Sequence, residues 1–157
     1  MIWDNLSKPF FALAPMNDVT DSVFRRVITS CAAPDIFFTE FVSVDTLQSS
    51  GKASMDNKLL FTDEEKPLVV QVWGIDPDNY EATSKELSTK GYAGIDINMG
   101  CPVAKIIKNG ACSALINNRE LAKKIIASTQ RGAGEIPVSV KTRIGYDHID
   151  LTWIEFI

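Results

Sequence analysis

The chain of 157 residues has little of several things that mark particular protein classes. It holds one histidine and three cysteines, which form neither a disulfide framework nor a cluster with zinc-ligand spacing. No apolar run approaches the roughly 20 residues that a transmembrane helix needs. The net charge of -4 gives no overall attraction for nucleic acid. We therefore expect a cytoplasmic, metal-free protein with free thiols, and neither a secretory signal nor a membrane segment.

Several common ligand-binding motifs are also missing. There is no P-loop, no dinucleotide-binding G-x-G-x-x-G and no nucleophile elbow, and no internal repeat is present. The share of hydrophobic residues (45%) and of charged residues (23%) is that of an ordinary globular protein. By length alone, the sequence predicts one domain.

What the chain does contain is an alternation of short apolar strands and helical segments. Strands are predicted at residues 10–14, 36–40, 68–73, 94–98 and 138–143. Helical segments are predicted at residues 21–30, 44–50, 76–90, 113–116, 118–131 and 150–157, with Thr20, Asp76 and Asn118 as N-caps. This alternation is typical of a parallel sheet covered by helices, either an open doubly wound sheet or a (β/α)8 barrel.

Polar side chains at the carboxyl ends of these strands favour the barrel. Glu40 ends the second strand, and Gln71 lies near the end of the third. The fourth and fifth strands alternate apolar residues with polar ones. With a period of two, Asp96 and Asn98 are predicted to share one face, as are Ser139, Lys141 and Arg143. Polar groups converging from successive strands are the active-site layout of a (β/α)8 barrel, whereas an open sheet feeds one crevice from fewer strands. A single buried polar residue would be as compatible with a satisfied core position.

Cys101 stands out among the cysteines because it directly follows the fourth strand. Gly100 permits a tight turn and Pro102 stiffens the exit, so the thiol is held where the polar side chains converge. An ordinary thiol is mostly protonated at neutral pH, which suits a proton donor, and a nearby base or cation would make it a nucleophile instead. Cys31 and Cys112 are expected to be structural.

A basic segment follows Cys101. Residues 101–112 include Lys105 and Lys108 and no acidic residue. Together with Lys141 and Arg143, they predict a basic rim suited to an anionic cofactor or a phosphate backbone. Ordinary surface lysines are the alternative interpretation.

Several motifs, taken together, resemble the amino-terminal part of the tRNA-dihydrouridine synthases, a family of flavin-dependent (β/α)8 enzymes. The most specific stretch is Ile-Asp-Ile-Asn-Met-Gly-Cys-Pro at 95–102, joined to Val-Ser-Val-Lys-Thr-Arg-Ile-Gly at 138–145. Further matching stretches are Val-Gln-Val-Trp-Gly at 70–74, Lys-Asn-Gly-Ala at 108–111 and Ala-Pro-Met at 14–16, of which the last is weak by itself. Cys112 stands where many relatives are expected to have glycine.

The resemblance implies roles for seven residues in FMN-dependent reduction of tRNA uridine to 5,6-dihydrouridine, with NADPH as reductant. Cys101 would be the general acid. Those expected to contact FMN are Pro15, Met16, Gln71 and Lys141, and those expected to orient the uracil are Asn98 and Arg143. The uridine must leave its stack to reach the pocket.

The length does not fit a whole enzyme of this kind, because a (β/α)8 barrel typically needs about 250 residues. We expect residues 1–157 to be the amino-terminal portion of an FMN-binding catalytic domain, monomeric when full-length. The rest of the barrel would be missing, with its phosphate-binding loops, a flavin-contacting histidine that His148 does not replace, and a carboxyl-terminal helical tRNA-binding domain. Two alternatives stay open: another flavin-dependent barrel acting on a free pyrimidine or an enoate, and an inactive truncated fragment.

Overall fold

Five parallel strands form a sheet in residues 2–157, the part of the chain that this computed structural model describes. The strands are β1 (Ala12–Leu13), β2 (Ile36–Ser43), β3 (Leu68–Trp73), β4 (Gly94–Met99) and β5 (Val138–Thr142). Each strand pairs in parallel with the next in chain order, from β1 to β5. All five predicted strands are therefore present.

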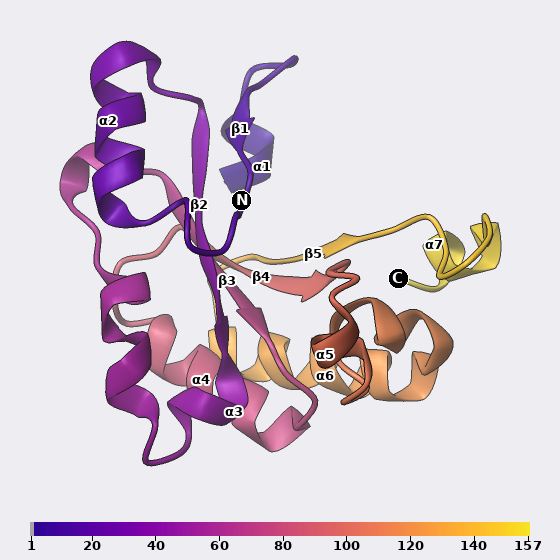
Figure 1. The fold of residues 1–157 in the computed structure, drawn as a ribbon. Helices are drawn as coiled ribbons and strands as arrows, with labels where there is room; N and C mark the ends of the chain where they lie inside the picture. The colour runs from indigo at the N-terminus through magenta and orange to yellow at the C-terminus, as the bar shows by residue number, and fades with distance from the viewer. Residues whose placement is uncertain (1) are drawn as a thin grey trace.

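The sheet has the curvature and strand order of a barrel wall. In Figure 1, β2 runs nearly upright and β5 nearly level, so the strand direction turns steadily across the sheet. A doubly wound sheet would instead reverse its strand order at a switch point. The fold is an incomplete TIM barrel with about five βα units, as the sequence predicts.

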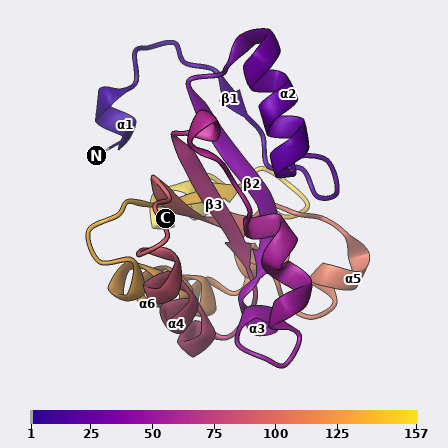
Figure 2. The same ribbon diagram turned by 90° about the vertical axis from the view of Figure 1, so that its left-hand side faces the viewer.

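Helices connect the strands. The α-helices are α1 (Ile2–Asn5), α2 (Ser22–Ala32), α3 (Val44–Leu47), α4 (Pro77–Leu87), α5 (Ala104–Ile107), α6 (Arg119–Ala133) and α7 (Leu151–Phe156). Three 3-10 helices are η1 (Lys52–Leu59), η2 (Asp63–Glu65) and η3 (Cys112–Asn117). Figures 1 and 2 show α4 and α6 side by side and away from α2, which flanks β2. None of the described helices is long and apolar enough to span a lipid bilayer.

Two of the three predicted helix caps are confirmed and one is wrong. The side chains of Asp76 and Asn118 accept hydrogen bonds from backbone N–H groups in the first turns of α4 and α6. At α2, however, the capping side chain is Asp21, whose carboxylate accepts from Phe24 N at 2.8 Å. Thr20 is fully buried and bonds the backbone of Met16 instead, so α2 begins one residue later than predicted.

Element bounds differ from the prediction at several other points. β1 is only two residues long, and β2 continues to Ser43 past Glu40, with a register shift between Phe38 and Phe41. Glu40 thus lies inside β2 rather than at its end. No helix is predicted in the basic segment 101–112 or in residues 51–67, but the first contains α5 and the second contains η1 and η2.

The core lies between the strands and the helices that cover them. Every residue of β4 is buried, and so are the first five residues of β3. Their apolar side chains pack with residues of α4 and α6, including Tyr80, Leu87 and Ile125. β5 is only partly buried. This rigid layer positions the polar side chains that point away from the helices.

Candidate functional site

The seven predicted site residues all lie at the carboxyl ends of strands. Gln71 is in β3, Asn98 in β4 and Lys141 in β5. The others follow strands directly: Pro15 and Met16 after β1, Cys101 after β4, and Arg143 after β5. The parallel sheet therefore brings them to the same end of the half-barrel.

A hydrogen-bonded chain joins Gln71, Asn98 and the Cys101 loop. Asn98 Nδ2 donates to Gln71 Oε1 at 2.9 Å. Asn98 Oδ1 accepts from the backbone N–H groups of Gly100 at 3.1 Å and Cys101 at 3.0 Å. Gln71 is fully buried and Asn98 nearly so, and both side chains have hydrogen-bond partners, as buried polar groups require.

The same chain continues to Asp96. Gln71 Nε2 donates to Asp96 Oδ2, and Ser139 Oγ donates to Asp96 Oδ1, each at 2.6 Å. Burial raises the pKa of Asp96, opposed by these two hydrogen bonds and by the nearby Lys141 ammonium. The predicted common face of Asp96 and Asn98 is confirmed, because both side chains bond Gln71. Of the three residues predicted to share a face of the fifth strand, Ser139 and Lys141 lie near Asp96, whereas Arg143 follows the end of β5.

Cys101 is half-buried in a loop held from two sides. Arg143 Nε donates to the carbonyl of Gly100 at 2.6 Å. Ser113 Oγ donates to the carbonyl of Cys101 at 2.9 Å. Cys112 is fully buried, adopts a φ of 54°, and has its pKa raised to about 12 by burial and by the neighbouring Cys101. The burial of Cys112 fits its expected structural role, whereas Cys31, for which the same role was expected, is exposed.

A cavity of about 320 Å³ opens beside the strands and brings Pro15 and Lys141 together. Its other lining residues are Trp3, Ala12, Ala14, Phe38, Asp96, Ser139 and Val140. Small side chains of β1 and its exit leave the space free, and Lys141 gives it a cation. Gln71, Asn98, Cys101 and Arg143 do not line this cavity and form a second group, linked to the first through Asp96 and Ser139. Met16 belongs to neither group and bonds Thr20 instead.

The loop that carries Pro15 and Met16 is fixed by an ion pair that the sequence does not reveal. Lys58 Nζ, from η1, donates to Glu40 Oε1 at 2.9 Å and to Asn17 Oδ1 at 2.6 Å. The same Glu40 oxygen accepts from the backbone N–H of Asp18 at 2.6 Å. Asp18 has a φ of 58°, a conformation held by these contacts.

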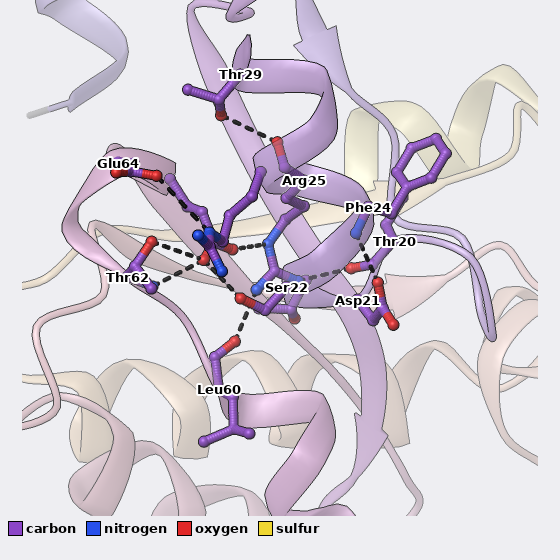
Figure 3. Close-up of polar contacts among 12 residues, drawn as sticks. Thr20, Asp21, Ser22, Phe24, Arg25, Thr29, Leu60, Thr62 and Glu64 are labelled. Atoms are coloured by element: carbon purple, nitrogen blue, oxygen red, sulfur yellow. Dashed lines mark hydrogen bonds and ion pairs between the residues drawn. The ribbon is translucent and has the colours of Figure 1, made fainter.

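Behind this loop, Arg25 joins three segments of the chain (Figure 3). Its guanidinium binds Glu65 Oε2 at 2.5 Å, the carbonyl of Thr20 at 2.6 Å and the carbonyl of Leu60 at 2.7 Å. The carboxylate of Glu65 also accepts from Ser22 Oγ at 2.7 Å. The end of the β1–α2 loop and the segment after η1 are thus anchored to one buried charge.

Lys58, Arg25 and Glu65 were missed by sequence reasoning because their partners are far along the chain. Arg25 and Glu65 are 40 residues apart, and Lys58 and Glu40 are 18 apart. Asp96 was recognised as a polar residue facing the interior, but its bonds to Gln71 and Ser139 depend on strand register, which the sequence does not state. Lys105 and Lys108 are exposed on and after α5, and their part in a basic rim stays a prediction.

Comparison with known proteins identifies the family. Residues 12–157 match the family model described as dihydrouridine synthase (Dus). A probable tRNA-dihydrouridine synthase of Staphylococcus aureus (strain COL) is 48% identical over 149 residues, covering 94% of this chain and 45% of that protein. Probable tRNA-dihydrouridine synthase 2 of Bacillus subtilis (strain 168) is 44% identical over 156 residues, covering 99% of this chain and 47% of that protein.

The chain spans about half the length of the curated relatives it matches. The family model, by contrast, matches almost the whole chain and includes every predicted site residue. Fold, motifs and similarity agree, and the chain belongs to the dihydrouridine synthase family.

Proposed function

We propose that this chain forms the amino-terminal part of an enzyme that reduces uridine in tRNA to 5,6-dihydrouridine in the cytoplasm, acting as a monomer. The observation that carries the proposal is the hydrogen-bonded chain from Asp96 through Gln71 and Asn98 to the Cys101 loop. It places an amide donor and a thiol at the carboxyl end of a barrel sheet, where (β/α)8 enzymes carry their chemistry.

The described residues fit part of a flavin site. The cavity between Pro15 and Lys141 has small side chains on one wall and a cation on another. Lys141 would stabilise negative charge on the reduced ring. Gln71, which is fully buried and does not line the cavity, would contact the ring only after its side chain is uncovered. The phosphate of FMN would be held by loops outside this chain, as in many barrels. When bound, FMN reduced by NADPH would supply the hydride.

Protonation is the task that this chain's own residues perform. Asn98 and Arg143 would orient the uracil ring beside Cys101. As hydride adds to one carbon of the ring's double bond, the Cys101 thiol gives its proton to the other carbon and is left as thiolate. The half-buried position of Cys101 allows contact with substrate while limiting contact with water.

A chimera tests the proposal directly: residues 1–157 joined to the remaining carboxyl-terminal part of the Bacillus subtilis relative. We expect it to form dihydrouridine in bulk tRNA, and Cys101→Ala to lower the rate at least about 100-fold, as loss of a general acid does. Cys31→Ala, at an exposed position of α2, is the matched control and should keep the parent rate. Normal dihydrouridine formation by the Cys101→Ala chimera would rule out the assigned role, and reduction of free uridine but not tRNA would favour a different flavin enzyme.

A further inference from the structure

The side-chain amides of Gln71 and Asn98 can satisfy their hydrogen bonds with only one placement of their oxygen and nitrogen atoms. Asn98 Oδ1 faces the backbone N–H groups of Gly100 and Cys101, which can only donate. Asn98 must therefore turn its Nδ2 toward Gln71, where it donates to Oε1 at 2.9 Å.

The other end of this hydrogen-bonded series, at Asp96, requires the same amide orientation. With its carbonyl oxygen engaged by Asn98, Gln71 turns Nε2 to Asp96 and donates to Oδ2 at 2.6 Å. Oδ2 of Asp96 is the acceptor of this bond, and the reverse amide orientation would set the Gln71 oxygen against it. Ser139 Oγ occupies the second oxygen of Asp96 at 2.6 Å, so both oxygens are engaged.

Burial makes the reversed orientation of these amides costly in free energy. The residue exposures of Gln71, Asp96 and Asn98 are 0%, 2% and 6%, so water offers little replacement for a lost partner. An unpaired polar group in such a place carries its full desolvation cost. Loss of the Asp96 acceptor is therefore expected to disturb Gln71, then Asn98, and then the backbone N–H groups of the Cys101 loop.

We propose that Asp96 is the positioning residue of the Cys101 loop: its carboxylate fixes the amide orientation of Gln71 and Asn98, and so holds the backbone N–H groups of Gly100 and Cys101. The inference deepens the proposed function, since it rests on Cys101 being the proton donor. It also sets what Asn98 offers a substrate. With Oδ1 occupied by two donors and one Nδ2 hydrogen given to Gln71, the remaining group is an N–H donor, which selects a base carbonyl such as those of uracil.

Amide hydrogen exchange of the chain labelled with ¹⁵N-cysteine and ¹⁵N-isoleucine tests the positioning role. The reporter is the Cys101 N–H. The reference is the N–H of Ile95, which lies on the same strand as Asp96 and donates to the Pro137 carbonyl at 2.9 Å. Asp96→Leu should speed exchange at Cys101 by about tenfold or more relative to Ile95, because Gln71 loses its acceptor. Asp96→Asn should change the ratio less than about twofold, since its oxygen can accept from Gln71 and its nitrogen can donate to Ser139.

A charge exchange provides a second test that does not depend on the leucine variant folding. Gln71→Glu alone sets two carboxylates face to face and should raise the Cys101 to Ile95 ratio as Asp96→Leu does. Combining it with Asp96→Asn restores a donor opposite an acceptor, leaves an oxygen facing Asn98, and should return the ratio to that of the parent chain.

Two results would overturn the proposal. One is an unchanged Cys101 to Ile95 ratio in both Asp96→Leu and Gln71→Glu. The other is equal acceleration at Cys101 and Ile95 that the double variant does not reverse, which would make Asp96 an ordinary stabilising residue. The exchange measurement needs neither FMN nor uridine, so its outcome is separate from that of the dihydrouridine assay.

Discussion

The guanidinium of Arg25 and the carboxylate of Glu65 form an ion pair in which neither side chain is exposed to solvent. Their Nε–Oε2 distance is 2.5 Å, and the remaining groups of both side chains bind Thr20, Leu60 and Ser22. Removing one member of a buried ion pair is strongly destabilising, because the other member is left as an unpaired charge in the interior. This pair is therefore the centre of the packing behind the β1–α2 loop.

Replacing Arg25 with methionine is expected to lower the free energy of unfolding by about 3–5 kcal/mol, the cost of stranding the Glu65 carboxylate in the interior. Urea unfolding followed by circular dichroism measures the change. The neighbouring Arg26 is the matched control, because its pair with Glu64 spans 3.7 Å at the surface, with both side chains more than half exposed. Arg26→Met should cost less than about 1 kcal/mol. Equal costs for the two variants would contradict the assignment.

Lys58→Met is expected to destabilise the chain by about 1.5–3 kcal/mol at neutral pH, since Glu40 loses a charged hydrogen-bond partner. Burial works to lower the pKa of Lys58, but hydrogen bonds to Glu40 and Asp18 outweigh it and raise the pKa. A raised pKa means that this stabilisation is complete below the unfolded pKa of about 10.4 and is lost as pH rises through the folded value. The difference between parent and variant should therefore shrink in strongly alkaline urea titrations.

Lys52→Met serves as the control for Lys58, because Lys52 also pairs with a glutamate but is nearly half exposed. Its loss should cost at most about 1 kcal/mol. A Lys58 effect no larger than that of Lys52, or one that persists unchanged above the pKa, would argue against a clamp on the loop that carries Pro15 and Met16.

Two of the three cysteines should react with iodoacetamide at pH 8, and the third should not. Cys31 is exposed and Cys101 half-buried, whereas the pKa of Cys112 is raised to about 12, so its thiol stays protonated and unreactive. Mass spectrometry of the digested protein should find Cys31 and Cys101 modified and Cys112 intact. In urea all three should react, and labelling of native Cys112 as fast as Cys31 would show that it is accessible.

The isolated chain is expected to bind FMN and riboflavin about equally weakly, because it lacks the loops proposed to hold the phosphate. The chimera should bind FMN at least about tenfold more tightly than riboflavin, since each charge-assisted hydrogen bond to a phosphate contributes about 1.5–3 kcal/mol. Flavin fluorescence titration measures both ligands on both proteins. Stoichiometric FMN copurifying with the 157-residue chain would contradict the expectation.

The sequence predicts those parts of the fold that depend on neighbours along the chain. The caps at Asp76 and Asn118 follow from local residue order, and the period-two pattern correctly places Asp96 and Asn98 on one face. Thr20 and Asp21 show the limit of local reasoning, because both are capping residue types and only tertiary burial of Thr20 decides between them.

The parts that the sequence does not predict depend on register and long-range contact. β2 continues to Ser43 past a register shift between Phe38 and Phe41, so Glu40 lies inside the strand, where it meets Lys58 of η1. The Gln71–Asp96 and Asp96–Ser139 bonds require β3, β4 and β5 to pair in one particular register. A register shift of one residue would turn these side chains toward the helix layer. The sequence of one strand alone does not determine the register in which it pairs.

The consecutive order of the strands bears on how the molecule is made. Because each strand pairs with the one synthesised just before it, the sheet can grow by addition at one edge as the nascent chain emerges. The Cys101 loop is an exception, since Arg143 reaches it from 43 residues downstream. We expect the segment around Cys101 to be translated early and to become fixed only when β5 has been added.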